Sequence, residues 1–154
     1  PTVDSLLQMR EAEGQRLKLD IMEKAANVLA LTDQIEALAP QAAEEYRERL
    51  RARIQELLGD SRFDEQRVLT EVAVFAEKTA IDEEIVRLRS HFAQLEKLVE
   101  LTEPVGRKID FLIQEMNREA NTIGSKSQNP EIAYLVVDLK AEIEKIREQV
   151  QNVE

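Results

Sequence analysis

The sequence predicts an all-α protein, an elongated bundle of about five helices that includes long antiparallel, coiled-coil-like helices. Only four glycines and four prolines interrupt its 154 residues, so long stretches can remain helical. Apolar residues recur at intervals of three and four along most of the chain, which is the spacing of one helix face. Charged residues make up 34% of the chain and fit the solvent-facing sides of such helices. Because this length is typical of one domain, residues 1–154 are expected to form a single helical domain.

The first helix is expected to begin near Asp4 or Ser5, because both side chains cap helix N-termini well. Apolar residues at helical spacing continue this helix toward Leu38. Pro40 is expected to end it, since proline lacks an amide hydrogen and its ring clashes with the preceding turn.

Two further helices are expected to complete long helical hairpins over about residues 4–101. One covers about 41–58 and is followed by a glycine-containing turn at 59–61. The next begins near Asp64 and continues as one helix to Leu101, a length of roughly 50 Å or more at about 1.5 Å per residue. Its apolar face is formed by Val74, Ile81, Ile85, Leu88, Phe92 and Leu95.

A short helix is expected over about 105–123, within the segment GRKIDFLIQEMNREANTIGSKS at 106–127. One arc of roughly 100° is apolar and holds Ile109, Leu112, Ile113, Met116, Ala120 and Ile123. The opposite arc is rich in amides and holds Asp110, Gln114, Asn117, Arg118 and Asn121. Glu115 and Glu119 stand one turn apart at the apolar edge, where a partly buried carboxylate needs a cation, a donor or a proton. An ordinary amphipathic helix with buried Glu–Arg pairs would show the same spacing.

The last helix is expected over about 130–152. Pro130 falls in its first turn, where the missing amide hydrogen costs little. Apolar residues then recur at three and four, at Ile132, Leu135, Val136, Leu139, Ile143, Ile146, Val150 and Val153. This heptad-like seam favours packing on another long helix.

Composition limits the possible functions. The net charge of −10 argues against broad, non-specific binding to nucleic acid, which needs a basic surface. Residues 105–127 are the least acidic part, with four Lys and Arg against three Asp and Glu. The absence of cysteine excludes disulfides and thiolate metal sites. No signal peptide is seen and no apolar run approaches the roughly 20 residues of a membrane span, so a cytoplasmic location without a membrane partner is expected.

The sequence shows no Gly-rich phosphate loop, no Ser/His/Asp arrangement and no aromatic platform for single-stranded bases. His91 is the only histidine, and Glu84 precedes it by seven residues along the same edge of the predicted helix. A lone histidine beside an apolar stripe is more often structural than a ligand. As ligands, imidazole and carboxylates suit Mn²⁺, Mg²⁺ or Zn²⁺. Because seven residues rise roughly 10 Å, one of the two residues would have to join carboxylates from another helix to hold an ion.

Several groups of residues in the segment 106–127 form a long, specific pattern: Gly106-Arg107-Lys108, Asp110-Phe111, Gln114-Glu115, Asn117-Arg118-Glu119, Asn121-Thr122 and Gly124-Ser125-Lys126-Ser127. This pattern resembles the signature of the YicC/YloC family. REAEGQRL at 10–17 and KAEIEKIREQVQNVE at 140–154 are also similar to that family, so the resemblance covers essentially the whole chain. It implies a bacterial endoribonuclease family whose members also have an N-terminal domain. The chain is therefore expected to be the C-terminal half of a longer protein.

The resemblance implies metal-dependent hydrolysis of RNA phosphodiester bonds, with RNA as the partner and a divalent metal as the cofactor, Mn²⁺ or Mg²⁺ before Zn²⁺. From their positions on the helix edges, Glu84, His91, Glu115 and Glu119 are the expected catalytic residues and metal ligands, with Asp110 as a further ligand. The expected RNA-binding residues are cationic or carry amides: Arg87, Arg107, Lys108, Gln114, Arg118, Asn121 and Lys126.

The alternative is a non-catalytic helical oligomerisation or adaptor module in RNA metabolism, in which the amide-rich arc is a protein–protein surface. The resemblance also implies a ring-like homo-oligomer, a hexamer in the full-length protein, so both hypotheses can hold together. They differ in one respect. An enzyme would lose activity on His91→Ala or Glu119→Gln and keep its assembly, whereas a structural cluster would lose stability first.

Overall fold

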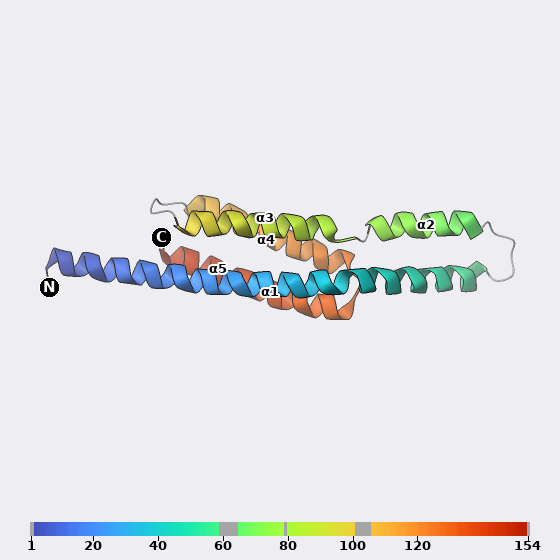
Figure 1. Cartoon of the computed structure of the whole chain (residues 1–154), viewed down its shortest axis with the longest axis horizontal. Coiled ribbons are helices and arrows are strands. Elements are labelled where there is room, and N and C mark those ends of the chain that lie inside the picture. The colour runs from blue at the N-terminus through green and yellow to red at the C-terminus, as the bar shows by residue number, and fades with distance from the viewer. Residues whose placement is uncertain (1, 59–64, 79, 101–105, 154) are drawn as a thin grey trace.

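The computed structural model describes residues 2–58, 65–78, 80–100 and 106–153, and these residues form five helices (Figure 1). They are α1 (Val3–Leu58), α2 (Glu65–Lys78), α3 (Asp82–Glu100), α4 (Gly106–Lys126) and α5 (Pro130–Val153). No strand occurs in this part of the chain, which confirms the predicted all-α class. The predicted turn at 59–61 lies outside the described residues.

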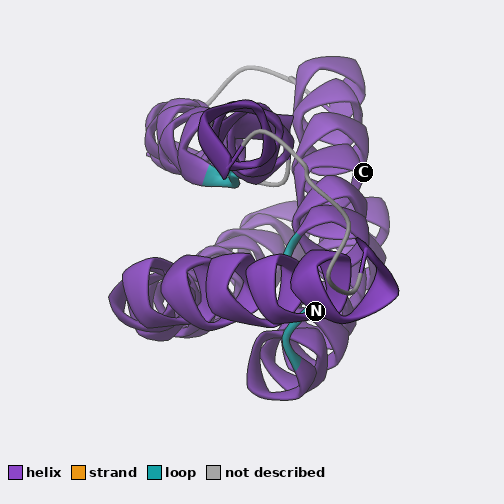
Figure 2. Ribbon diagram, turned by 90° about the vertical axis from the view of Figure 1, so that its right-hand side faces the viewer, coloured by secondary structure: helices purple, strands orange, loops and turns teal. Residues whose placement is uncertain are grey.

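The helices form an elongated bundle built along α1. This helix runs the length of the molecule, and its N-terminal part extends beyond the other helices (Figure 1). α2 and α3 follow one another back along α1, and α4 then runs antiparallel to α3. α5 runs antiparallel to α4 and packs along α1, so α3, α4 and α5 gather around the middle of the long helix (Figures 1 and 2).

The core lies where the apolar stripes of α1, α3, α4 and α5 meet. Its largest fully buried apolar side chains include Ile35, Leu88, Leu95, Met116, Ile123, Ile132, Leu139, Ile143 and Ile146. The whole predicted apolar arc of α4 is buried, at Ile109, Leu112, Ile113, Met116, Ala120 and Ile123. Polar residues next to this arc therefore lie at the edges of helix–helix contacts. None of the described helices is both long enough and apolar enough to cross a lipid bilayer.

The predicted break at Pro40 is wrong, because α1 continues through that residue. A proline inside a helix removes one hydrogen bond and costs about 3 kcal/mol. Core residues on both sides, Ile35 and Ala42, oppose this cost by holding the helix against its neighbours. Pro40 itself is exposed, so water can solvate the Glu36 carbonyl that loses its amide donor. Tertiary packing overrides the local signal here.

The predicted single helix over 64–101 is also wrong, because the chain forms two helices there, α2 and α3. α3 begins with three acidic residues in its first turn, Asp82, Glu83 and Glu84. Negative charge is favourable at that position because the free amides of a helix N-terminus carry partial positive charge. Such an acidic run is a sequence signal for a helix start, and the apolar periodicity alone did not reveal it.

α4 ends at Lys126, three residues beyond the predicted end near 123. Gly124 lies within it, and a Cβ added there would approach Val136 Cγ1 to 3.2 Å. The missing side chain thus permits the close approach of α4 to α5. Asn129 then caps α5, since its Oδ1 accepts a hydrogen bond from the Ile132 amide at 3.0 Å.

Pro40→Ala is expected to raise the free energy of unfolding by about 1–3 kcal/mol, because it restores a hydrogen bond to the Glu36 carbonyl. Urea unfolding followed by circular dichroism measures the change. Pro130→Ala is the matched control, because Pro130 is the first residue of α5 and blocks no internal hydrogen bond. It should change the stability by less than about 0.5 kcal/mol. A Pro40→Ala variant no more stable than wild type would contradict a continuous α1.

Candidate active site

α3 and α4 bring the chain's only histidine to a buried carboxylate. His91 Nδ1 lies 3.4 Å from Glu119 Oε2. Glu119 is buried and His91 is largely buried. Neither of the two facing atoms makes a hydrogen bond within the residues that the structure describes. Buried polar atoms normally have partners, so this pair is costly unless a proton, a cation or a ligand completes it.

The positions of the two side chains follow from helical spacing. His91 lies about one turn from each of the buried residues Leu88 and Leu95, at the edge of the apolar stripe of α3. Glu119 has the same relation to the apolar stripe of α4. Because the two stripes pack against each other in antiparallel fashion, their polar edges meet. The His91–Glu119 pair is therefore a product of the core packing.

Glu115 and Arg118 extend the His91–Glu119 pair toward solvent. Glu115 stands one turn before Glu119 on the same edge of α4 and is partly buried. Arg118 Nη1 lies 3.7 Å from Glu115 Oε1, and most of the arginine side chain is exposed. The arrangement thus leads from a buried imidazole–carboxylate contact to an exposed cation within about one helical turn.

Burial raises the pKa of the Glu119 carboxyl, because its charged form loses solvation. The nearby Glu115 charge adds to the rise in pKa, and His91 opposes it. The raised pKa keeps a proton on this carboxyl to a higher pH than on a free glutamate. A perturbed carboxyl beside an imidazole is a common arrangement for acid–base chemistry, and buried structural pairs share it.

Glu84 forms a separate ion pair with Lys126. Lys126 Nζ donates a hydrogen bond of 2.7 Å to Glu84 Oε1, and Glu84 is buried. The pair connects the first turn of α3 to the last turn of α4. Seven residues separate Glu84 from His91, which is roughly 10 Å along α3. The two predicted site residues therefore serve different parts of the α3–α4 contact.

The structure places Gln114 and Asn121 away from the His91–Glu119 pair. Each residue turns the helix by about 100°, so Asn121 projects about 160° and Gln114 about 140° away from Glu119. Both are exposed. They share α4 with the candidate site and face a different side of the molecule.

Asp110 also lies outside the candidate site. It stands nine residues before Glu119 and so projects from the opposite side of α4. There it faces α5, where the Glu144 carboxylate and, more weakly, Asp110 raise the pKa of the Arg147 guanidinium. The structure thus does not bring the five expected metal ligands together.

Two protein atoms nevertheless suit a divalent ion, His91 Nδ1 and Glu119 Oε2, because both are buried and unpartnered in the described part of the chain. No group of three or more His, Asp or Glu side chains is placed to hold a metal among the described residues. Mg²⁺ and similar ions are commonly held by one or two carboxylates, with water and phosphate oxygens as the other ligands. The pair, with Glu115 nearby, would therefore need further ligands from water or from a bound molecule to complete the coordination of an ion.

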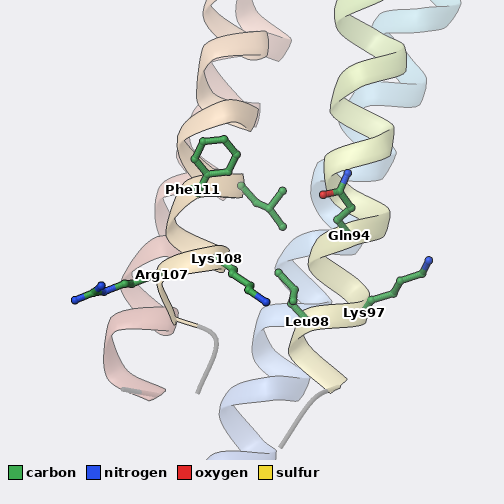
Figure 3. A pocket seen from close by; sticks show the side chains of 7 residues that line it. Gln94, Lys97, Leu98, Arg107, Lys108 and Phe111 are labelled. Carbon is green, nitrogen blue, oxygen red and sulfur yellow. The ribbon is translucent and has the colours of Figure 1, made fainter. Parts of the chain in front are cut away.

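The remaining predicted cations lie on both sides of the His91–Glu119 pair. Arg87 is one turn before His91 on α3 and pairs with the exposed Glu83 at 3.0 Å. Arg107 and Lys108 line a groove at the other end of the α3–α4 contact (Figure 3). The groove also contains residues that the sequence did not single out as functional: Gln94, Lys97, Leu98 and Phe111. The sequence did offer one sign of this groove, because Phe111 is an aromatic residue that lies outside the apolar arc of α4.

These features define a class: an all-α protein with a buried imidazole–carboxylate pair, bordered by exposed cations along one pair of helices. Comparison with known families then gives the family. Residues 35–154 match the family model described as "Endoribonuclease YicC-like, C-terminal", and this range contains the whole candidate site. The chain belongs to the endoribonuclease YicC-like family, which confirms the resemblance seen in the segment 106–127.

Two curated relatives support the same family, and both are named probable endoribonuclease YicC. The protein from Clostridioides difficile strain 630 is 51% identical over 150 residues, which are 97% of this chain and 51% of the relative. The protein from Haemophilus influenzae strain Rd is 36% identical over 148 residues, which are 96% of this chain and 51% of the relative. The chain therefore spans about half the length of these relatives.

Glu119→Gln is expected to flatten the pH dependence of stability. Because the folded pKa of Glu119 is raised, the folded state holds this proton to a higher pH than the unfolded chain does. The free energy of unfolding of wild type therefore falls as the pH rises from about 4.3 through the raised folded pKa. Glutamine cannot ionise, so the variant should gain stability relative to wild type over that range.

Urea unfolding between pH 4 and pH 8 measures this difference. Glu23→Gln is the matched control, because Glu23 is an exposed carboxylate on α1. Its curve should follow that of wild type. Parallel curves for wild type and Glu119→Gln would contradict a raised pKa at Glu119.

Proposed function

We propose that this chain is the C-terminal half of a longer, cytoplasmic, metal-dependent endoribonuclease, and that it carries the residues that cut the RNA phosphodiester bond. The observation that carries the proposal is the His91–Glu119 pair, whose facing atoms are buried and unpartnered among the described residues. Relatives that match nearly the whole chain are named probable endoribonucleases. Phosphodiester cleavage requires proton transfer beside positive charge, and the α3–α4 contact offers both.

In this proposal His91 and Glu119 hold the divalent ion, with Glu115 as a further ligand. Mixed nitrogen and oxygen donors suit Mn²⁺, the carboxylates also suit Mg²⁺, and Zn²⁺ is the second choice. When bound, such an ion polarises the phosphate and lowers the pKa of a bound water. The protein's own contribution is to hold its donors rigidly at a core contact, so that little reorganisation is needed.

Arg118 is the side chain best placed to neutralise the phosphate. Its 3.7 Å contact with Glu115 is long, and an exposed ion pair of this kind contributes little free energy. The guanidinium can therefore turn to a phosphate, which it can bind through two parallel hydrogen bonds. The raised pKa of Glu119 fits its place beside the charge of Glu115 in a site with little water, where a bound cation would stabilise the ionised carboxylate. Arg87 lies on the same edge of α3 as His91 and would contact the RNA next to the cleaved bond.

His91→Ala and Glu119→Gln are each expected to lower the cleavage rate by about 100-fold or more, because each removes a proposed acid–base group and metal ligand. A labelled structured RNA is incubated with the full-length protein and with this chain, in Mn²⁺, in Mg²⁺ and in EDTA. EDTA should stop the cutting.

Glu23→Gln should cut at the wild-type rate, and circular dichroism with sedimentation should show that all variants keep their helices and assembly. Undiminished cutting by both site variants would overturn the assignment of the active site. Undiminished cutting in EDTA would overturn the metal dependence. Loss of fold or assembly together with activity would instead support the structural role of the pair.

A second function, self-association, is favoured by the part of α1 that extends beyond the other helices (Figure 1). Val3, Leu6 and Leu7 are spaced for one helix face and are exposed. Exposed apolar residues in a row mark contact surfaces more often than isolated ones do. We propose that this face packs on a second copy of the chain, in the homo-oligomer that is expected to be a hexamer for the full-length protein.

Leu6→Ser combined with Leu7→Ser is expected to shift the assembly toward smaller species, because it removes the apolar contact. Analytical ultracentrifugation measures the species present. Val137→Ser is the control, since Val137 is an exposed apolar residue on α5. A double variant that assembles as wild type does would exclude this face as the interface.

A further inference from the structure

The groove between the end of α3 and the start of α4 is a candidate site that the cleavage chemistry does not use. It has a volume of about 480 Å³. Leu98 from α3 and Leu112 from α4 give it apolar walls, and Gln94 adds an amide (Figure 3). An apolar hollow with a few polar groups at its rim is typical of ligand sites.

Phe111 is the unusual residue of this groove, because it is 60% exposed. An aromatic ring normally gains free energy from burial, and a phenylalanine has no polar group that prefers water. Its ring lies beside the gap between the two helices (Figure 3). Exposed aromatic rings on nucleic-acid-binding proteins stack on unpaired bases. The sequence alone indicated no aromatic platform for single-stranded bases, and this exposed ring is the one candidate that the groove offers.

Three cations line the groove together with Phe111: Lys97, Arg107 and Lys108. Lys108 extends from α4 across the groove toward α3, whereas Arg107 and Lys97 point away on either side (Figure 3). None of the three forms an ion pair with a carboxylate of the described residues. In a chain with a net charge of −10, this is a local concentration of free positive charge. It suits an anionic ligand whose phosphates can reach around the ring.

The groove lies on the same pair of helices as the proposed active site. Gln94 and Leu98 share with His91 one edge of α3, because they follow it by three and seven residues. Phe111 and Glu119 are eight residues apart on α4, which is about 12 Å along the helix. At about 3.4 Å per nucleotide of a stacked strand, this distance corresponds to three or four nucleotides. One strand can therefore occupy both places.

We propose that the groove binds one unpaired nucleotide of the RNA strand that is cut at the His91–Glu119 pair. The base stacks on Phe111 against the apolar walls, and Lys108 binds its phosphate. This inference rests on the proposed function and adds a substrate class to it. The preferred RNA has an unpaired base within about four nucleotides of the cut.

An unpaired nucleotide engages the exposed ring and Lys108 together, and other ligands do so less well. A duplex offers phosphates to the cations, but its bases are stacked and paired and leave the ring without a partner. A protein segment would cover the ring and would need several carboxylates of its own to satisfy three cations. Single-stranded RNA carries a phosphate beside every free base face.

Binding is measured in EDTA, which prevents cutting, with a labelled unstructured 12-nucleotide RNA and with a blunt duplex of the same sequence. Phe111→Leu keeps an apolar side chain and removes the ring, so affinity for the single strand should fall about 5- to 150-fold. Affinity for the duplex should stay the same. Phe111→Tyr keeps the ring and should bind as wild type does. Tyr134→Leu removes an exposed ring on α5 and is the matched control, with no change expected.

The proposed phosphate contact has its own measurement. Lys108→Gln should lower the slope of log affinity against log salt for the single strand by about 0.7–1. Lys140→Gln makes the same change in net charge at an exposed position on α5, and should leave the slope unchanged. Equal effects of the two substitutions would show a general charge effect and would overturn the Lys108 contact.

The outcomes separate this inference from the proposed function. Unchanged single-strand affinity in Phe111→Leu would overturn the proposal that the groove binds an unpaired nucleotide. If wild type nevertheless cuts RNA and His91→Ala does not, the proposed function holds although the groove proposal fails. Equal losses in Phe111→Leu and Phe111→Tyr, or an equal loss for the duplex, would also overturn stacking. If wild type neither binds nor cuts any RNA, both proposals fall.

Discussion

The antiparallel packing of α3 on α4 is the constraint on which the rest of the molecule depends. Two apolar stripes interlock, and their register decides which polar residues at the stripe edges meet. In the observed register Glu84 meets Lys126 at one end of the contact and His91 meets Glu119 near its middle. A slip of one helical turn, about 5.4 Å, would separate both pairs. α1 packs on α3 and α5 packs on α4, and these contacts help to hold the register in place.

The two polar pairs at this contact differ in the distance between their facing atoms, 2.7 Å for Lys126–Glu84 and 3.4 Å for His91–Glu119. Glu84 Oε1 accepts a hydrogen bond from Lys126, whereas Glu84 Oε2 is buried without a hydrogen bond among the described residues, so the lysine compensates its burial only in part. The His91–Glu119 contact is longer, and both facing atoms lack a hydrogen bond among the described residues. A helical core could easily have closed such a gap with an apolar pair. Polar groups retained at a cost in stability are characteristic of functional sites.

Periodicity predicted the fold class and the buried face of α4, because apolar spacing is a property of each helix by itself. It failed at Pro40 and at the start of α3, where the outcome depends on contacts with other helices and on helix-end electrostatics. The same limit applies to the site. The edge positions of His91 and Glu119 could be predicted from one helix at a time, but their pairing required the register between two helices. The expectation that Asp110 belongs to the site failed for the same reason. The sequence of one helix does not show which neighbouring helix each of its faces contacts.

α4 carries both the exposed Phe111 ring and the buried Glu119 carboxylate on one uninterrupted helix. The helix therefore fixes the distance between the two side chains. A loop in the same place would let the two positions drift, whereas a helix fixes their separation in steps of about 1.5 Å and 100° per residue. An insertion of a single residue between Phe111 and Glu119 would swing one of them off the α3–α4 edge. An insertion of seven would preserve the facing and lengthen the interval by about 10 Å. Length variation within this family should therefore be strongly suppressed inside α4 and tolerated in the connections at its two ends.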